Sequence, residues 1–95
     1  MKVSVRLFTT LRELAGKGKE TLEFSAEVVA VKMVLEELAK QHGQAFREYL
    51  FNEKGKVREH LQLLVNGRSV DFLEELETRL KEGDQVAIVP PVGGG

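Results

Sequence analysis

The carboxyl end of the chain offers the clearest candidate for chemistry. The segment Pro90–Val92 is followed by three glycines, Gly93, Gly94 and Gly95, and Gly95 carries the terminal carboxylate. Glycine buries almost no apolar area and loses the most backbone entropy on ordering, so residues 90–95 are predicted to form an exposed, flexible tail. Six extended residues reach at most about 20 Å. Without side chains, the tail fits a slot too narrow for any Cβ and delivers the carboxylate to a partner's active site.

A second interpretation of this tail stays open at this point. Short glycine runs also occur as inert frayed ends or as remnants of an expression vector. The two prolines, which lack an N–H to donate, end ladder hydrogen bonding after the preceding strand in either case. The rest of the sequence is needed to distinguish a terminal carboxylate that takes part in chemistry from an inert chain end.

The other polar residues form no recognisable catalytic or metal-binding pattern. His42 and His60 have no nucleophile within sequence range and are predicted to be surface residues. The pairs Glu36-Glu37 and Glu74-Glu75 are predicted to lie on solvated faces. No metal-ligand spacing or phosphate-binding glycine motif occurs, so the sequence predicts neither a metal site nor a bound cofactor.

Composition sets the class of protein and excludes several functions. The 95 residues predict one domain, 1–95, with one modest core. The formal charge of −1, from 14 basic and 15 acidic residues, argues against a general nucleic-acid or anionic-membrane binder, although a local basic patch stays open. The absence of cysteine removes thiol nucleophiles, disulfides and iron–sulfur clusters. No apolar run predicts a membrane span or signal peptide, so the cytoplasm is the expected location.

Hydrophobic periodicity predicts strands before and after one long helix. Residues 2–7 and 20–24 alternate as half-buried strands, with Phe24 facing inward, and Thr9-Thr10 is expected to cap a short helix over residues 11–15 with Leu14 on its inner face. Residues 30–42 carry a helical apolar stripe that ends at Gly43. Residues 44–58 show the least periodicity, with Phe46 and Leu50 expected to fill a gap in the core.

The second half of the chain predicts a hairpin and a final strand. Residues 61–65 alternate, Asn66-Gly67 is a strong two-residue turn signal, and residues 68–70 return as a short strand. Residues 71–76 are predicted to form one helical turn, and residues 86–89 a buried strand. This order indicates an α+β, β-grasp (ubiquitin-like) domain, with a mixed β-sheet, one main α-helix packed on one face, and the first and last strands parallel at its centre.

Strand parity also predicts an apolar group on the outer face of the sheet. Phe8, Leu64, Ala87 and Val89 fall on the phase opposite to the core residues. Scattered exposed apolar residues are ordinary, whereas a contiguous patch at the root of the tail marks a docking surface. We interpret the group as a docking surface. Phe8 and Val89 need not be neighbours along a strand for this.

The sequence resembles the ubiquitin-like sulfur carriers of the MoaD/ThiS type, most closely the small subunit of molybdopterin synthase. The resemblance covers essentially the whole chain. It rests on residues 5–8 and 11–16, on Leu35-Glu36-Glu37-Leu38, on Val65-Asn66-Gly67, and on the ending from Leu80 to Val92 before the glycines. Gly93 departs from the pattern, because the family usually has Ala, Ser or Thr there.

This resemblance implies a carrier and not an enzyme. An E1-like adenylating enzyme uses ATP to activate the Gly95 carboxylate, a sulfur donor converts it to a thiocarboxylate, and Gly93 and Gly94 thread the tail. The large subunit of molybdopterin synthase then takes the sulfur. Partner binding is expected at Phe8, Val89, Pro90, Pro91 and Val92.

Two alternatives to the molybdopterin function stay open. The same carrier chemistry serves tRNA thiolation, thiamine synthesis or conjugation to protein lysines. A non-catalytic β-grasp binding module with an inert tail is the other class.

Overall fold

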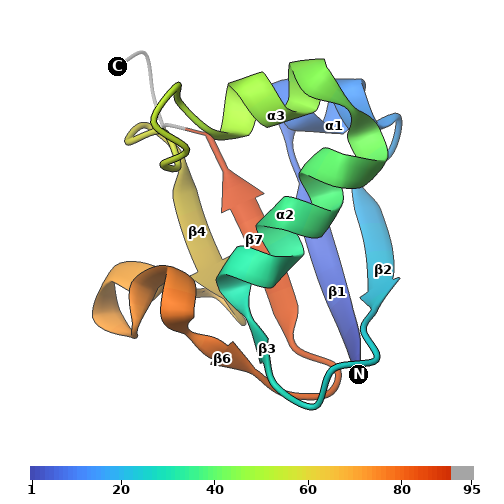
Figure 1. Cartoon of the computed structure of the whole chain (residues 1–95), viewed down its shortest axis with the longest axis vertical. Coiled ribbons are helices and arrows are strands. Elements are labelled where there is room, and N and C mark those ends of the chain that lie inside the picture. Colours follow the sequence, from blue (N-terminus) through green and yellow to red (C-terminus); the bar gives the residue numbers. More distant parts are fainter. Residues whose placement is uncertain (91–95) are drawn as a thin grey trace.

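The computed structural model describes residues 1–90 and shows a mixed five-stranded sheet with helices across one face (Figure 1). The strand order is β2-β1-β7-β4-β5, and β3 and β6 form a separate two-stranded ladder. The elements are β1 (Lys2–Leu7), α1 (Thr9–Ala15), β2 (Lys19–Glu23), β3 (Val29–Ala30), α2 (Val31–His42), α3 (Gln44–Leu50), β4 (Gln62–Val65), β5 (Arg68–Ser69), η1 (Val70–Phe72), η2 (Glu75–Glu77), β6 (Arg79–Leu80) and β7 (Gln85–Val89).

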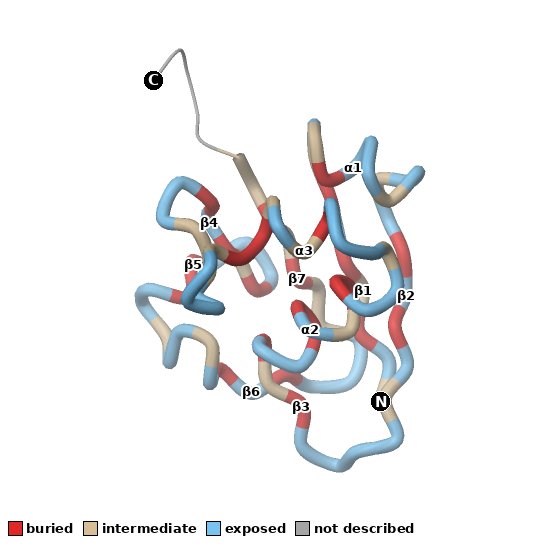
Figure 2. Tube along the Cα trace, turned by 45° about the horizontal axis from the view of Figure 1, so that its top comes forward, coloured by how far each residue is buried: buried red, intermediate tan, exposed pale blue. Residues whose placement is uncertain are grey.

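The two central strands, β1 and β7, pair in parallel, as the apolar character of both segments predicted. Val5 lies beside Val86 and Leu7 beside Ile88, and all four side chains are buried. On either side, β2 pairs with β1 and β4 pairs with β7, both antiparallel. Figure 2 shows the alternation of buried and less buried residues along these strands. The sheet therefore has one face turned to the core and one turned outward.

Helix α2 packs its apolar stripe on the inner face of the sheet. Its bounds agree with the predicted helix to within one residue, and its buried side chains are those of the stripe: Val31, Val34, Leu35, Leu38 and Ala39. Complete burial of a Val or Leu side chain stabilises a fold by about 1.5–3 kcal/mol. The first turn of the helix has no side-chain cap, and the Val31 N–H instead donates to the Thr78 carbonyl at 3.0 Å. No helix in residues 1–90 has the length and apolarity needed to cross a bilayer.

Helix α1 differs from the prediction in two respects. The N-cap residue is Phe8, which makes no side-chain capping bond, and Thr9 and Thr10 lie inside the helix. Leu14 is 38% exposed and does not share the inner face with Leu11. A helix of only seven residues makes about two turns, and its inner face buries one side chain completely, that of Leu11.

Helix α3 was not predicted and fills the gap assigned to Phe46 and Leu50. Both of these side chains are completely buried, so the core assignment was right although the helix was missed. Gly43 has φ +95°, a conformation that favours glycine, and it ends α2 while serving as the N-cap residue of α3.

The segment between β5 and β7 forms two 3₁₀ turns and a short strand. The predicted single turn over 71–76 is divided into η1 and η2, and Val70 begins η1 and is not part of the return strand. Leu73 and Leu76 pack against the core, while Phe72 is 81% exposed. Phe24, expected inside, lies just beyond β2 and is partly buried.

Candidate functional site

The predicted group of apolar residues lies on the outer face of the sheet, around its central strands. Phe8, Leu64, Ala87 and Val89 are all partly exposed, in contrast to their buried neighbours along the chain. The ladder sets Leu64 opposite Ala87 and Gln62 opposite Val89. Directly opposite residues have Cβ atoms about 4.5–5.5 Å apart, so the central strands support a contiguous patch. We call Phe8, Leu64, Ala87 and Val89 the outer patch.

Parity places Phe8 and Val89 on the same face of the sheet, and the strand register also places them at the same end of it. The parallel register pairs Leu7 with Ile88, and Phe8 and Val89 each follow by one residue. Both residues therefore stand side by side where the two central strands end. The Arg6 guanidinium lies over the Phe8 ring, 5.7 Å from its centroid. Sequence reasoning missed Arg6, although it precedes Phe8 by two residues and therefore shares its parity and its face of the sheet.

The tail begins at this same end of the sheet. Strand β7 ends at Val89, and Pro90 follows with a partly exposed ring. The predicted roles of Pro91, Val92, Gly93, Gly94 and Gly95 lie outside the described residues. The structure therefore brings together three predicted site residues, Phe8, Val89 and Pro90.

Hydrogen bonds made by the side chains of Asn66 and Asp84 hold the start of β7 in position at the other end of the sheet. We call these bonds the clasp. Asn66, in the turn after β4, donates from Nδ2 to Asp84 Oδ1 at 3.0 Å, and its Oδ1 accepts from the Gln85 N–H at 2.9 Å. Asp84 Oδ2 also accepts from the Lys81 N–H at 2.8 Å. Asn66 and Gly67 both have positive φ, 52° and 84°, as a two-residue hairpin turn of type I′ requires. The predicted turn at Asn66-Gly67 is therefore bonded to the turn that leads into β7.

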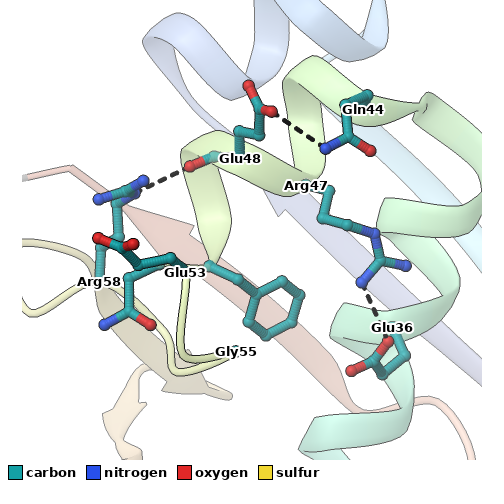
Figure 3. A pocket seen from close by; sticks show the side chains of 9 residues that line it. Glu36, Gln44, Arg47, Glu48, Glu53, Gly55 and Arg58 are labelled. Atoms are coloured by element: carbon teal, nitrogen blue, oxygen red, sulfur yellow. Dashed lines mark hydrogen bonds and ion pairs between the residues drawn. The ribbon is translucent and has the colours of Figure 1, made fainter.

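Two hollows are present whose lining includes no residue of the outer patch. One of about 430 Å³ lies between α2, α3 and the turn after α3 (Figure 3). Its two arginines already have partners within the chain: Arg47 Nη1 lies 3.5 Å from Glu36 Oε2, and Arg58 Nε donates to the backbone carbonyl of Glu48 at 2.8 Å. Its lining contains no Ser, Cys or His that could act as a nucleophile or base. A broader groove of about 1010 Å³ runs along β4 and is bordered by Pro90.

The two histidines occupy different environments. His60 is exposed, as predicted, with its ring edge-on to Tyr49. The prediction for His42 was wrong, because its side chain is only 12% exposed and its Nε2 lies 2.7 Å from Glu20 Oε2. Glu20 falls on the inward parity of β2 and is 5% exposed. A buried carboxylate needs such a partner, so His42 has a structural role in joining α2 to β2.

Comparison with known proteins identifies the family of the chain that carries these features. The model of the ThiS family matches residues 5–95, which include the outer patch, the tail and all of the sheet except residues 2–4 of β1. The chain belongs to the ThiS family of ubiquitin-like sulfur carriers. Members of this family carry sulfur and are not catalysts, and they depend on an E1-like adenylating partner.

Relatives of this ThiS-family carrier have different names at nearly equal similarity. Small archaeal modifier protein 3 of Haloferax volcanii is 33% identical, with all of both chains covered. The molybdopterin synthase sulfur carrier subunit of Drosophila melanogaster is 32% identical over all of this chain and 92% of that one. Identity alone therefore gives the class of carrier and not the sulfur acceptor.

Solved structures confirm the β-grasp fold of this carrier. The crystal structure of SAMP1 from Haloferax volcanii superposes with a TM-score of 0.86 at 27% identity, covering 100% of both chains. The predicted α+β class, the mixed sheet and the single main helix across one face are all confirmed.

Proposed function

We propose that this carrier holds sulfur as a thiocarboxylate on Gly95 and donates it for molybdopterin synthesis in the cytoplasm. The observation that supports this most is the position of the outer patch. Phe8 and Val89 both lie at the end of the sheet where β7 leads into Pro90, which the terminal glycines follow in sequence. A surface that docks a partner at this place brings residues 91–95 to the partner's active site.

The chemistry requires little from the folded body. The adenylating enzyme joins the Gly95 carboxylate to AMP with release of pyrophosphate, which turns a poor electrophile into a mixed anhydride. Hydrosulfide supplied by a sulfur donor then attacks the acyl carbon, AMP leaves, and the thiocarboxylate remains. The carrier contributes its terminal carboxylate, the length of its tail and its docking surface. Gly93 and Gly94 have no side chains, so the tail is narrow where it threads into the partner.

The proposed acceptor is the large subunit of molybdopterin synthase. The Drosophila relative, whose name assigns it to molybdopterin synthase, supports this acceptor. A second candidate is conjugation to proteins, which the 33% identity to small archaeal modifier protein 3 favours. Both candidates start from the adenylated Gly95 and differ in the later step. For molybdopterin, the thiocarboxylate sulfur attacks a pterin precursor bound to the large subunit; for conjugation, a lysine amine attacks the acyl carbon and AMP leaves.

Mass spectrometry of the intact protein tests the proposal. The carrier is incubated with its adenylating enzyme, ATP and a sulfur source, and replacement of one terminal oxygen by sulfur is the expected result. A matched variant without Gly94 and Gly95 should fold normally and stay unmodified. An unmodified full-length chain would support an inert tail.

A second incubation separates the two acceptors. When the large subunit and pterin precursor are added, loss of the terminal sulfur with formation of the dithiolene is expected. Persistence of the thiocarboxylate, together with the appearance of carrier–lysine adducts, would favour the protein modifier.

A further inference from the structure

Four cations surround the outer patch on its α1 and β2 side. Arg6 on β1 and Lys19 on β2 are directly paired in the ladder, and Arg12 and Lys17 lie in the segment that joins these strands. All four are exposed, and Glu13 is the one carboxylate in residues 6–19. We call Arg6, Arg12, Lys17 and Lys19 the basic rim.

The pairing of Arg6 with Lys19 is unfavourable for the isolated protein. Like charges directly opposite each other across two strands destabilise a sheet. At the other end of the same ladder, Lys2 faces Glu23, which is the favourable arrangement. The position of Arg6 and Lys19 is therefore not explained by the stability of the β1–β2 pair.

The basic rim is poorly neutralised from within the chain. Among residues 1–90, no carboxylate lies within 4.0 Å of Arg6, Arg12 or Lys19. Lys17 reaches Glu20 at 4.0 Å, but Glu20 is already paired with His42 at 2.7 Å.

Arg12 is held close to the start of β2. A Cβ placed on Gly18 would lie 3.3 Å from Arg12 Cδ, so the arginine side chain lies over this glycine. Arg12 therefore lies beside the residue between Lys17 and Lys19, and its charge adds to theirs.

Charge is polarised along the strands of the sheet. The basic rim lies at the end where β1 leads into α1 and β7 leads into Pro90 (Figure 1). Residues 71–84 contain six carboxylates against two cations. Part of that segment is bonded to the opposite end of β1, where Glu82 accepts from the Lys2 N–H and the Asp84 carbonyl accepts from the Ser4 N–H. A chain with a formal charge of −1 therefore presents positive charge beside the root of its tail.

We propose that the basic rim steers the carrier onto a carboxylate-lined protein surface of the adenylating enzyme that takes up the tail. This inference rests on the proposed function and adds the charge of the partner surface. A protein is favoured over a nucleic acid because the rim borders the apolar outer patch, which needs an apolar counterpart. Opposite charges around an apolar contact speed association and fix the orientation of docking more than they add affinity.

Stopped-flow association with the adenylating enzyme tests the inference. Arg6→Glu and Lys19→Glu should each slow association about tenfold or more at about 0.01–0.1 M salt. The difference from the wild type should largely disappear near 1 M salt, where the Debye length falls to about 3 Å. Arg79 is exposed on β6, at the opposite end of the fold from the end of β7 (Figure 1). The control variant Arg79→Glu makes the same change in net charge and should associate at the wild-type rate.

The same variants contain a check on folding. Each single replacement puts opposite charges face to face on β1 and β2, so Tm should stay unchanged or rise while association slows. A structural role for Arg6 or Lys19 would instead lower Tm.

Three results would overturn the proposal. One is an unchanged association rate for both rim variants. Another is an equal slowing in Arg79→Glu, which would indicate a general effect of net charge. The third is binding of tRNA by the wild type that the rim variants lose while they still associate normally with the enzyme. Absence of adenylation in the wild type would count separately against the proposed function.

Discussion

Ile88 and Val89 are consecutive residues of β7 that face opposite sides of the sheet, and they allow the outer patch to be separated from the core. Ile88 has no exposed surface, whereas Val89 is partly exposed opposite Gln62. Ile88→Ala should lower the free energy of unfolding by about 3 kcal/mol, within the range for large-to-small core changes. For a domain of this size that corresponds to a fall in Tm of roughly 12–24 °C.

Val89→Asp should have the opposite effects, with little change in stability and a clear loss of binding to the adenylating enzyme. Its side chain leaves no cavity in the core, so the cost is limited to strand preference, at most about 1 kcal/mol or roughly 4–8 °C in Tm. An aspartate at the centre of a desolvated apolar contact should weaken binding of the adenylating enzyme at least about tenfold, which is about 1.4 kcal/mol.

Circular dichroism melting and titration calorimetry with the adenylating enzyme measure the two effects. Ile88→Ala, studied below its lowered Tm, serves as the control and should bind within about threefold of the wild type. If Val89→Asp unfolds as early as Ile88→Ala, Val89 does not face outward and the reasoning fails. If it melts and binds like the wild type, the outer patch is not the docking surface.

Three further changes test other parts of the structure. Phe8→Asp should reproduce the binding loss of Val89→Asp with little change in Tm, and two unrelated phenotypes would argue against one continuous patch. Asn66→Ala removes the side-chain bonds of Asn66 to Asp84 Oδ1 and to the Gln85 N–H and should cost about 1–3 kcal/mol, seen as a lower urea midpoint at constant slope; an unchanged midpoint would contradict the role given to the clasp. His42→Ala leaves Glu20 without its nearest partner and should cost about 3 kcal/mol by the same assay; a neutral result would mean that water replaces the imidazole.

The sequence predicted those elements whose signals are local and repeated. The alternation of Val3, Val5 and Leu7, and the helical stripe over 31–42, each repeat a period several times, and both elements are present as predicted. Helix α3 has only Phe46 and Leu50 as buried positions, a single i, i+4 pair, and it follows Gly43, which also ends α2. The β3–β6 ladder has two residues in each strand, too few for any alternation to be detected.

The site was predicted less completely than the fold, for a related reason. Parity identified the outward side chains of Phe8 and Val89 from the sequence alone. Their position at the same end of the sheet depends on the register between β1 and β7, which lie about 80 residues apart in sequence, and that register is a property of the whole sheet. The like-charged pair Arg6 and Lys19 depends in the same way on the β1–β2 register.

The register of β7 connects the clasp at one end of the sheet with the outer patch at the other. Because side chains alternate along a strand, a slip of one residue would turn Val89 into the core and Ile88 out to solvent. Asn66 and Asp84 oppose such a slip, since they bond the turn after β4 directly to the start of β7. A patch that lies beside Pro90 is thus positioned by polar contacts of residues far from it. Substitutions in the clasp should therefore affect docking through the position of Val89, even though neither Asn66 nor Asp84 belongs to the outer patch.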